Sequence, residues 1–283
     1  MAGPLRLKEL MLSIAALLAM GTFQEAPPPK PAPDTVVATV GGAPITAGEI
    51  EPYLWAWKSK EVIRDLAGHR AIAAEAAKLG ITASSDEVKK RIADQIERIK
   101  AQLPPGQSID DVINGQVGGP SRLALVARSS ILVDKIAEAE FKPDGYVKVA
   151  TLLFRTNGGT TDELTKAIKS ADAAYASLQQ GKPWTDVLRL YEKNPQIVAN
   201  GGLVGWKAYG VFPESVRSQL GTLKLMGVTK PVQTELGIQI FRLMARGVSA
   251  NPNELADLKG QYVQGARQAI VERIRQQNKV EIK

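Results

Sequence analysis

The chain has 283 residues, of which 44% are hydrophobic and 23% are charged, and its formal net charge is +7. This length allows two domains with buried cores, and the lack of cysteine excludes disulfides, thiolate metal sites and a cysteine nucleophile. The single histidine, His69, cannot build a histidine-rich metal site, so no metal is expected. The basic surplus has no cluster of lysine and arginine interleaved with aromatic residues, so no nucleic-acid partner is expected.

The first 23 residues have the pattern of an export signal. Arg6 and Lys8 precede a mostly apolar run, residues 10–23, which is shorter than the roughly 20 apolar residues that a membrane-spanning helix needs. Residues 1–23 are therefore predicted to be a secretory signal peptide or, as the alternative, an uncleaved anchor that tethers the chain to a membrane. Both alternatives predict an exported protein of the periplasm or cell envelope.

A proline-rich spacer separates this segment from the folded chain. Residues 24–34 contain five prolines in an eight-residue stretch, which favours an extended polyproline conformation. Residues 35–146 are then predicted to form a helical N-terminal domain, in which a strand precedes a helix that Thr46 and Glu49 begin as a capping box. Apolar residues at helical spacing predict further helices over 61–78, 85–103 and 121–140.

Residues 147–246 alternate strands and helices in the manner of a compact α+β domain. A β-branched and apolar run predicts a strand over 147–154, and Thr161 or Asp162 is predicted to cap a long helix that Gly181 ends. Near the end of the stretch, Ile238 and Ile240 alternate with Gln239 and Phe241, which predicts a strand that follows a turn. The elements predicted between these are helices over 184–190 and 213–220, with a glycine run at 200–206 between them.

The last segment, residues 250–283, predicts one more long helix over 253–277 and a possible strand at 280–282. The helix carries an apolar stripe that it cannot bury alone. We therefore expect it to return to the N-terminal domain and to make that domain discontinuous.

Two short runs within residues 147–246 point to a family. Asn200–Trp206 has three glycines in five residues, and Lys230–Phe241 places a proline and a glycine on either side of a short spacer before a strand. Together with the Gly-Lys-Pro-Trp run at 181–184, they resemble a parvulin-type peptidyl-prolyl isomerase (rotamase) domain. From residue 35 onward, the chain resembles the SurA-like and PrsA-like extracytoplasmic foldases. The resemblance implies an α+β fold in which a parvulin-like domain, a small sheet with surrounding helices, is inserted in a mainly helical chaperone-like domain.

The resemblance implies catalysis of rotation about an X-Pro amide, which breaks no bond and needs no cofactor. It implies catalytic roles for Thr151, Asn194, Thr234 and Gln239, of which only Thr234 is the residue that the family usually has. Thr151 and Gln239 stand where the family usually has histidines, and Asn194 where it has an acid or a cysteine. These replacements can form hydrogen bonds, but they do not titrate near neutral pH. The apolar substrate pocket implied by the resemblance consists of Val204, Phe212, Val216 and Leu220.

Two functions stay open at this stage. The first is an isomerase-like foldase that assists the folding of exported proteins, and the second is a catalytically inactive, parvulin-like holdase. In both, the partner is an unfolded or proline-containing polypeptide, which the helical domain is expected to hold. Tyr53, Trp55 and Trp57 belong either to the core of that domain or to a groove that grips clients. An adaptor for one folded partner is a more remote alternative.

Overall fold

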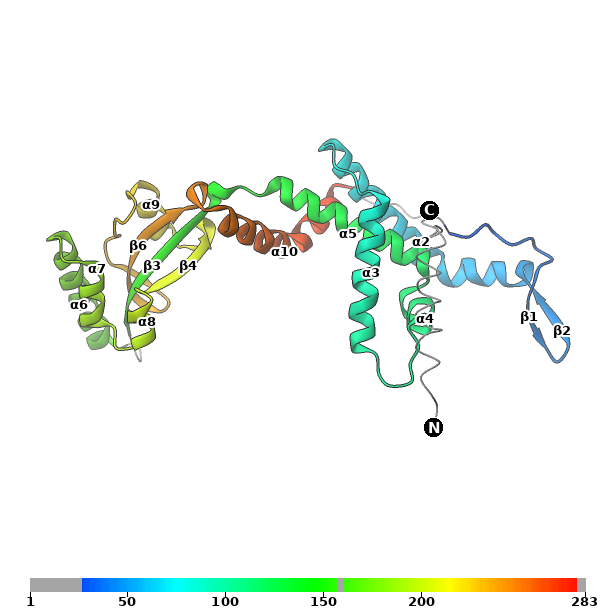
Figure 1. Cartoon of the computed structure of the whole chain (residues 1–283), viewed down its shortest axis with the longest axis horizontal. Helices are drawn as coiled ribbons and strands as arrows, with labels where there is room; N and C mark the ends of the chain where they lie inside the picture. Colours follow the sequence, from blue (N-terminus) through cyan, green and yellow to red (C-terminus); the bar gives the residue numbers. More distant parts are fainter. Residues whose placement is uncertain (1–26, 157–159, 279–283) are drawn as a thin grey trace. The chain divides into compact units, whose positions relative to one another are not determined.

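A computed structural model of the chain describes residues 27–156 and 160–278. They fall into two units: the sheet unit, Phe141–Tyr262, and the helical unit, which lies before Phe141 and after Tyr262 (Figure 1). The predicted signal segment and the predicted strand at 280–282 lie outside the described residues. Within the described ranges, no helix combines the length and the apolar character needed to cross a membrane.

The helical unit begins with a two-stranded antiparallel hairpin and continues as helices. Capping boxes begin its two longest early helices: Thr46 with Glu49 at the start of α2, as predicted, and Ser84 with Glu87 at the start of α3. The elements in chain order are β1 (Val36–Val40), β2 (Ala43–Thr46), α2 (Ala47–Lys78), α3 (Ser85–Gln102), α4 (Ile109–Asp111), η1 (Val112–Val117) and α5 (Pro120–Glu140), and the later part of α10 (Pro252–Gln277) completes the unit.

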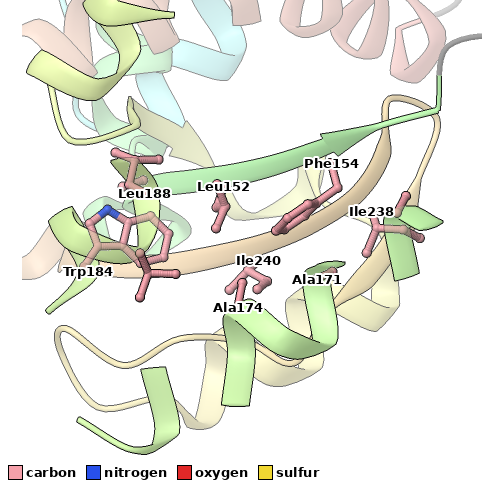
Figure 2. Packing of buried hydrophobic residues seen from close by; sticks show 11 residues of the cluster. Leu152, Phe154, Ala171, Ala174, Trp184, Leu188, Ile238 and Ile240 are labelled. Carbon is pink, nitrogen blue, oxygen red and sulfur yellow. The ribbon is translucent and has the colours of Figure 1, made fainter. Parts of the chain in front are cut away.

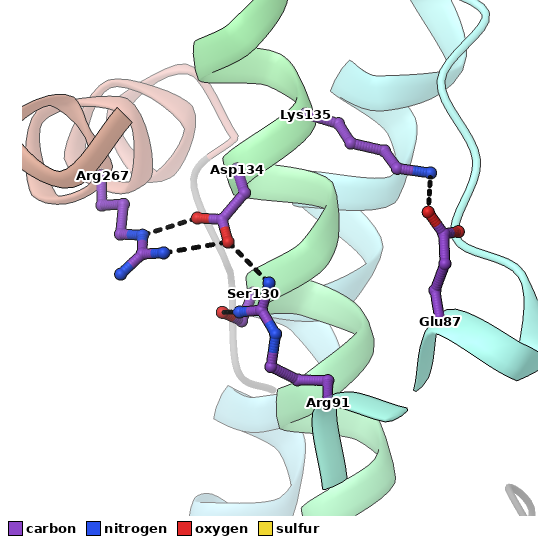
Figure 3. A network of polar contacts seen from close by, with 6 residues as sticks. All are labelled: Glu87, Arg91, Ser130, Asp134, Lys135 and Arg267. Atoms are coloured by element: carbon purple, nitrogen blue, oxygen red, sulfur yellow. Dashed lines mark hydrogen bonds and ion pairs between the residues drawn. The ribbon is translucent and has the colours of Figure 1, made fainter. Parts of the chain in front are cut away.

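A buried carboxylate joins three helices of this unit (Figure 3). Asp134 of α5 is 8% exposed, and it accepts hydrogen bonds from Arg267 of α10 at 2.5 and 2.9 Å and from Arg91 of α3 at 2.8 Å. On the same helix, the Lys135 ammonium lies 2.6 Å from Glu87 and lowers the pKa of that carboxyl to about 2. The later part of α10 and α3 are therefore each bound to α5 by charge-assisted hydrogen bonds to the same carboxylate.

The three aromatic residues near the start of α2 are not buried. Trp55 and Trp57 are 72% and 75% exposed, and Tyr53, whose ring lies 5.5 Å from that of Trp57, is also exposed. The predicted place for them in the core of the helical unit is therefore wrong. The helix forms there as expected, but no described element covers this part of it.

The sheet unit contains a four-stranded antiparallel sheet in the order β4-β3-β6-β5. The α+β fold class expected from the sequence is confirmed. The elements are η2 (Pro143–Gly145), β3 (Tyr146–Arg155), α6 (Thr161–Gln179), α7 (Trp184–Tyr191), α8 (Pro195–Ala199), β4 (Leu203–Ala208), η3 (Tyr209–Val211), α9 (Glu214–Thr222), β5 (Val232–Thr234), β6 (Gly237–Arg246) and η4 (Gly247–Ser249), followed by the first part of α10.

Apolar clusters cover both faces of this sheet. One face carries Ile238 and Ile240, and Figure 2 shows them packed with residues of β3, α6 and α7. The opposite face carries Phe241 and Leu243, which pack with apolar residues of β3 and α9. Because successive side chains of a strand point to opposite faces, β6 serves both cores. The labelled members of the first cluster are Leu152, Phe154, Ala171, Ala174, Trp184, Leu188, Ile238 and Ile240.

The chain passes from one unit to the other at two points. The division falls after Glu140, where α5 ends, and after Tyr262, so that α10 contributes to both units. The domain boundaries expected from the sequence, at residues 146/147 and near 246–250, stay a prediction about which segments fold together.

Candidate functional site

A groove of about 540 Å³ opens on the face of the sheet that carries Phe241. Its floor comes from the two central strands, where Thr151 pairs with Phe241 and Leu153 pairs with Gln239, two register positions apart and on the same face. Its walls come from the ends of β4 and η3, the start of α8 and the turn between β5 and β6. The residues that line it are Thr151, Leu153, Arg155, Glu192, Ile197, Val204, Lys207, Val211, Phe212, Pro213, Thr234, Glu235, Leu236, Gln239 and Phe241.

A line of neutral hydrogen bonds crosses the floor of this groove. The Thr234 hydroxyl lies 2.8 Å from Oε1 of Gln239, and Nε2 of Gln239 donates to the Thr151 hydroxyl at 3.2 Å. The Thr151 hydroxyl in turn donates to the carbonyl of Ile240 at 3.4 Å. The side-chain amide of Gln239 is thereby held in one orientation. A primary amide has two N–H donors, and no hydrogen bond among the described residues uses the second donor of Gln239.

An apolar wall stands beside this line. The ring of Phe212 meets that of Phe241 edge to face, with centroids 5.6 Å apart and an interplanar angle of 80°. Both rings are largely buried, whereas Val204 and Val211 on the rim are exposed. Edge-to-face packing fixes the orientation of both rings, so the groove presents a preformed apolar surface next to a preformed polar one.

The charged residues of the groove lie at its rim. Arg155 at the end of β3 and Lys207 on β4 are exposed, as is Glu235 in the β5–β6 turn, and Glu192 after α7 is half-buried. The chain's one imidazole, His69, belongs to α2 of the helical unit, where burial lowers its pKa. The polar line on the floor therefore works without a titratable group of its own.

The structure brings together five of the eight predicted site residues. Thr151, Thr234 and Gln239 form the polar line, and Val204 and Phe212 line the wall. The remaining three residues of the prediction, Asn194, Val216 and Leu220, do not line the groove.

Each of those three has a structural role. Asn194 is exposed, and its side-chain oxygen caps α8 by accepting a hydrogen bond from the backbone of Gln196 at 2.9 Å. Val216 and Leu220 have no exposed surface, because the apolar face of α9 packs onto the sheet in the cluster with Leu243. Direct contact of Val216 or Leu220 with a substrate is therefore excluded in this conformation.

Two floor residues, Leu153 and Phe241, were not predicted as part of the site. Strand alternation supplies the missing signal, since Leu153 is two residues from Thr151 and Phe241 is two residues from Gln239. Residues at that spacing share a face of the sheet, so the polar positions would have identified them.

The comparisons with known proteins cover the segment that holds this groove. The rotamase family model, a PPIC-type PPIase domain, matches residues 152–245, the segment from β3 to β6. The foldase protein PrsA of Clostridium perfringens is 26% identical over 279 residues, which cover 83% of this chain and 80% of that protein. The chain contains a parvulin-type domain and is similar to PrsA and SurA.

Further parvulin-type relatives cover different shares of the chain. The chaperone SurA of Legionella pneumophila is 26% identical over 171 residues, which cover 60% of this chain and 39% of that protein. Among solved structures, PrsA of Bacillus cereus aligns with 89% of this chain and 95% of its own at 13% identity, with a TM-score of 0.49. The groove lies within the parvulin domain of the chain, and Thr151 immediately precedes the matched residues.

Proposed function

We propose that the chain is a PPIase-like foldase and chaperone that binds unfolded, proline-containing polypeptide and speeds rotation about X-Pro bonds. The observation that supports this proposal is the groove of the parvulin domain, in which an apolar wall adjoins an oriented hydrogen-bond donor. Export to the periplasm or cell envelope is part of the proposal, supported by the apolar run at residues 10–23. A membrane tether through the same run is proposed as the alternative to cleavage.

The chemistry needs binding and orientation but no nucleophile. The barrier to rotation about a peptide bond is about 18–20 kcal/mol and comes from amide resonance. A proline ring held against Phe212 and Phe241 would place its amide next to Gln239. The free N–H of Gln239 can then donate to the amide as it twists and loses resonance, and a contact that strengthens in the twisted state lowers the barrier.

The Gln239 amide is neutral, and this limits how much its hydrogen bond can lower the barrier to rotation. A neutral hydrogen bond contributes about 0.5–1.5 kcal/mol, against about 1.5–3 kcal/mol when one partner is charged. Since 1.4 kcal/mol is a factor of ten, the polar line of this chain is expected to accelerate rotation by about tenfold or less. Most of any further acceleration would come from the apolar wall and the exclusion of water.

Exchange of a Leu-Pro peptide between its cis and trans forms, followed by NMR with and without the purified chain, tests the proposal. The chain is expected to accelerate this exchange, and the Val204→Ala, Phe212→Ala double variant is expected to lose at least tenfold in rate because the proline ring loses its wall. Gln239→Leu keeps the volume of the side chain but removes both donors, and it is expected to lose about fivefold to tenfold.

Gln233→Leu is the matched control for the amide substitution. Gln233 lies on β5, is exposed and does not line the groove, so its replacement is expected to leave the exchange rate unchanged. Equal rates for Gln239→Leu and the unmodified chain would remove the polar line from the mechanism.

A binding-only holdase is the second candidate. It is favoured by the hydrogen bonds that the three polar side chains of the groove make with one another, and by the exposed surface of Trp55 and Trp57. No acceleration for any peptide tested, combined with suppression of the aggregation of an unfolded protein, would support the holdase and contradict the isomerase.

The rate of X-Pro exchange is expected to be independent of pH between about pH 6 and 8. The polar line consists of two hydroxyls and one amide, none of which titrates in this range. The measurement is the NMR exchange rate at several pH values with a peptide that itself lacks titratable groups. A change of more than threefold across this range would show that a charged group of the rim, and not the polar line, determines the rate.

A further inference from the structure

A second groove lies in the helical unit, away from the parvulin domain. It consists of two adjoining hollows of about 650 and 380 Å³ that share lining residues from α2 and α10, and α5 closes one of them. Their volumes are in the range of sites that enclose a ligand or part of a peptide. The shared residues are Arg64, Gly68, Ile72, Val271 and Arg275.

The groove exists because α2 presents small side chains to it. Ala67, Gly68 and Ala71 lie along the wall that faces the first hollow, opposite Val271 and Ile274 of α10. A Cβ atom added at Gly68 would have no atom within 4 Å, and the helical backbone there tolerates any residue. The space over Gly68 is therefore open to a side chain from outside, and the surface that this side chain would meet is apolar.

The charge at the groove is positive. The second hollow has Arg64, Arg267 and Arg275 against a single carboxylate, Asp65. Asp65 is bound to Arg122 at 2.7 Å, and Arg267 is paired with Asp134, a carboxylate that it shares with Arg91. Arg275 has only a loose, exposed pair with Glu272 at 3.6 Å. Among the described residues, the acidic neighbour of Arg64 is Glu61, whose carboxylate is already paired with Lys58 and Arg122. In this part of the chain, two cations thus stand over an apolar floor, and neither has a close carboxylate to itself.

We propose that this groove binds an extended segment of a client polypeptide in which apolar side chains alternate or lie close to acidic ones. The apolar side chains fit the space over Gly68, and the acidic ones meet Arg64 and Arg275. This inference rests on the proposed foldase function and makes it more specific, because it gives the chain a sequence preference that does not involve proline. A flat lipid surface does not fit a concave site of this kind.

Fluorescence anisotropy with a labelled, proline-free peptide tests this preference. A nine-residue peptide of leucines and glutamates is expected to bind the full chain about threefold to tenfold more tightly than the same peptide with lysines. Each exposed ion pair contributes little to affinity, so two such pairs are expected to give a ratio of this modest size. The ratio of the affinities for the glutamate and lysine peptides is expected to fall towards one at 0.5 M salt, because salt screens the interactions of exposed charges.

Two pairs of variants separate the groove from the rest of the surface. Gly68→Leu fills the space and is expected to weaken binding of the leucine-glutamate peptide at least tenfold. Gly265 lies on the exposed side of α10, and a Cβ atom there would also have no neighbour within 4 Å, so Gly265→Leu is expected to leave binding unchanged. The Arg64→Glu, Arg275→Glu double variant is expected to bind the lysine peptide more tightly than the glutamate peptide. Arg70→Glu, on α2 but outside the groove, is the control for charge.

The outcomes distinguish this inference from the proposed function. Gly68→Leu is expected to keep the X-Pro exchange rate, and the Val204→Ala, Phe212→Ala variant is expected to keep binding of the leucine-glutamate peptide. Equal affinity for the two peptides, or equal effects of Gly68→Leu and Gly265→Leu, would overturn the inference even if isomerase activity is found. Binding that occurs only after deletion of residues 279–283 would also overturn it, because the chain's own end would then be the occupant.

Discussion

Replacement of Asp134 by alanine is expected to lower the free energy of unfolding of the helical unit by about 3 kcal/mol. Removal of one member of a buried ion pair costs about 3–5 kcal/mol, because the opposite charge remains without a partner. Here two guanidinium groups lose their carboxylate. The lower end of the range applies because the side chains of Arg91 and Arg267 are 32% and 46% exposed, so water compensates part of the loss.

Hydrogen exchange of the full chain, read by mass spectrometry, is the suitable measurement because it reports on α3, α5 and α10 separately from the sheet unit. A loss of 3 kcal/mol corresponds to a faster exchange by about a hundredfold in helices that open together. The control is Glu51→Ala, which removes the pair between Lys30 and Glu51, whose side chains are 66% and 54% exposed. That variant is expected to change exchange less than threefold. A similarly small change for Asp134→Ala would mean that apolar packing alone holds α10.

The Asp134 contacts also connect stability to the second groove. Arg267 precedes Val271 and Arg275 by one and two turns on α10, and these residues form one wall of the groove. A helix that is no longer held by Asp134 would not present that wall in a fixed position. The Asp134→Ala variant is therefore expected to lose part of its affinity for the leucine-glutamate peptide, although Asp134 itself does not line the groove.

Local signals in the sequence predicted much of the fold. The capping box of Thr46 and Glu49 predicted the start of α2, and the alternation from Ile238 predicted the strand β6. The N-cap of α6 was predicted less well, because several neighbouring residues can cap a helix. Thr160, and not Thr161 or Asp162, caps α6, since its hydroxyl accepts a hydrogen bond from the backbone of Glu163 three residues on. The five-residue helix α8 was not predicted, since one turn of helix carries no apolar period.

Burial was the harder property to predict from the sequence. An apolar residue on an amphipathic helix faces either a core or a ligand, and the pattern is the same in both cases. Val216 and Leu220 face the core, while Trp55 and Trp57 face solvent. The polar line is a further example, because Thr151 and Gln239 are 88 positions apart and only the pairing of β3 with β6 brings them together. Family resemblance identified those positions, but their hydrogen bonds depend on the register of the strands.

Replacement of Gly202 by alanine is expected to destabilise the sheet unit by about 2–5 kcal/mol and to abolish the acceleration of X-Pro exchange. The backbone of Gly202 has a φ of +72°, and a Cβ atom there would lie 2.5 Å from the carbonyl oxygen of Thr151. A left-handed backbone conformation costs a residue with a side chain about 1–2 kcal/mol, and relief of a close contact in a packed region adds about 1–3 kcal/mol. The carbonyl of Gly202 also accepts a 2.8 Å hydrogen bond from the backbone of Thr151. A shift that relieves the contact would therefore move Thr151, the end of the polar line, away from Gln239.

Gly201→Ala is the matched control for this prediction. Gly201 has almost the same φ, +71°, but an added Cβ atom would have no neighbour within 4 Å. It is therefore expected to cost only the conformational part, about 1–2 kcal/mol, and to keep the exchange rate of the unmodified chain. Hydrogen exchange of β3 and β4 measures the stability of both variants, and NMR exchange of the Leu-Pro peptide measures their activity. If the two alanine variants lose the same stability, the contact with Thr151 is relieved at no cost. If Gly202→Ala keeps its activity despite lost stability, the position of Thr151 does not control the groove, and the apolar wall of Phe212 and Phe241 carries the catalysis alone.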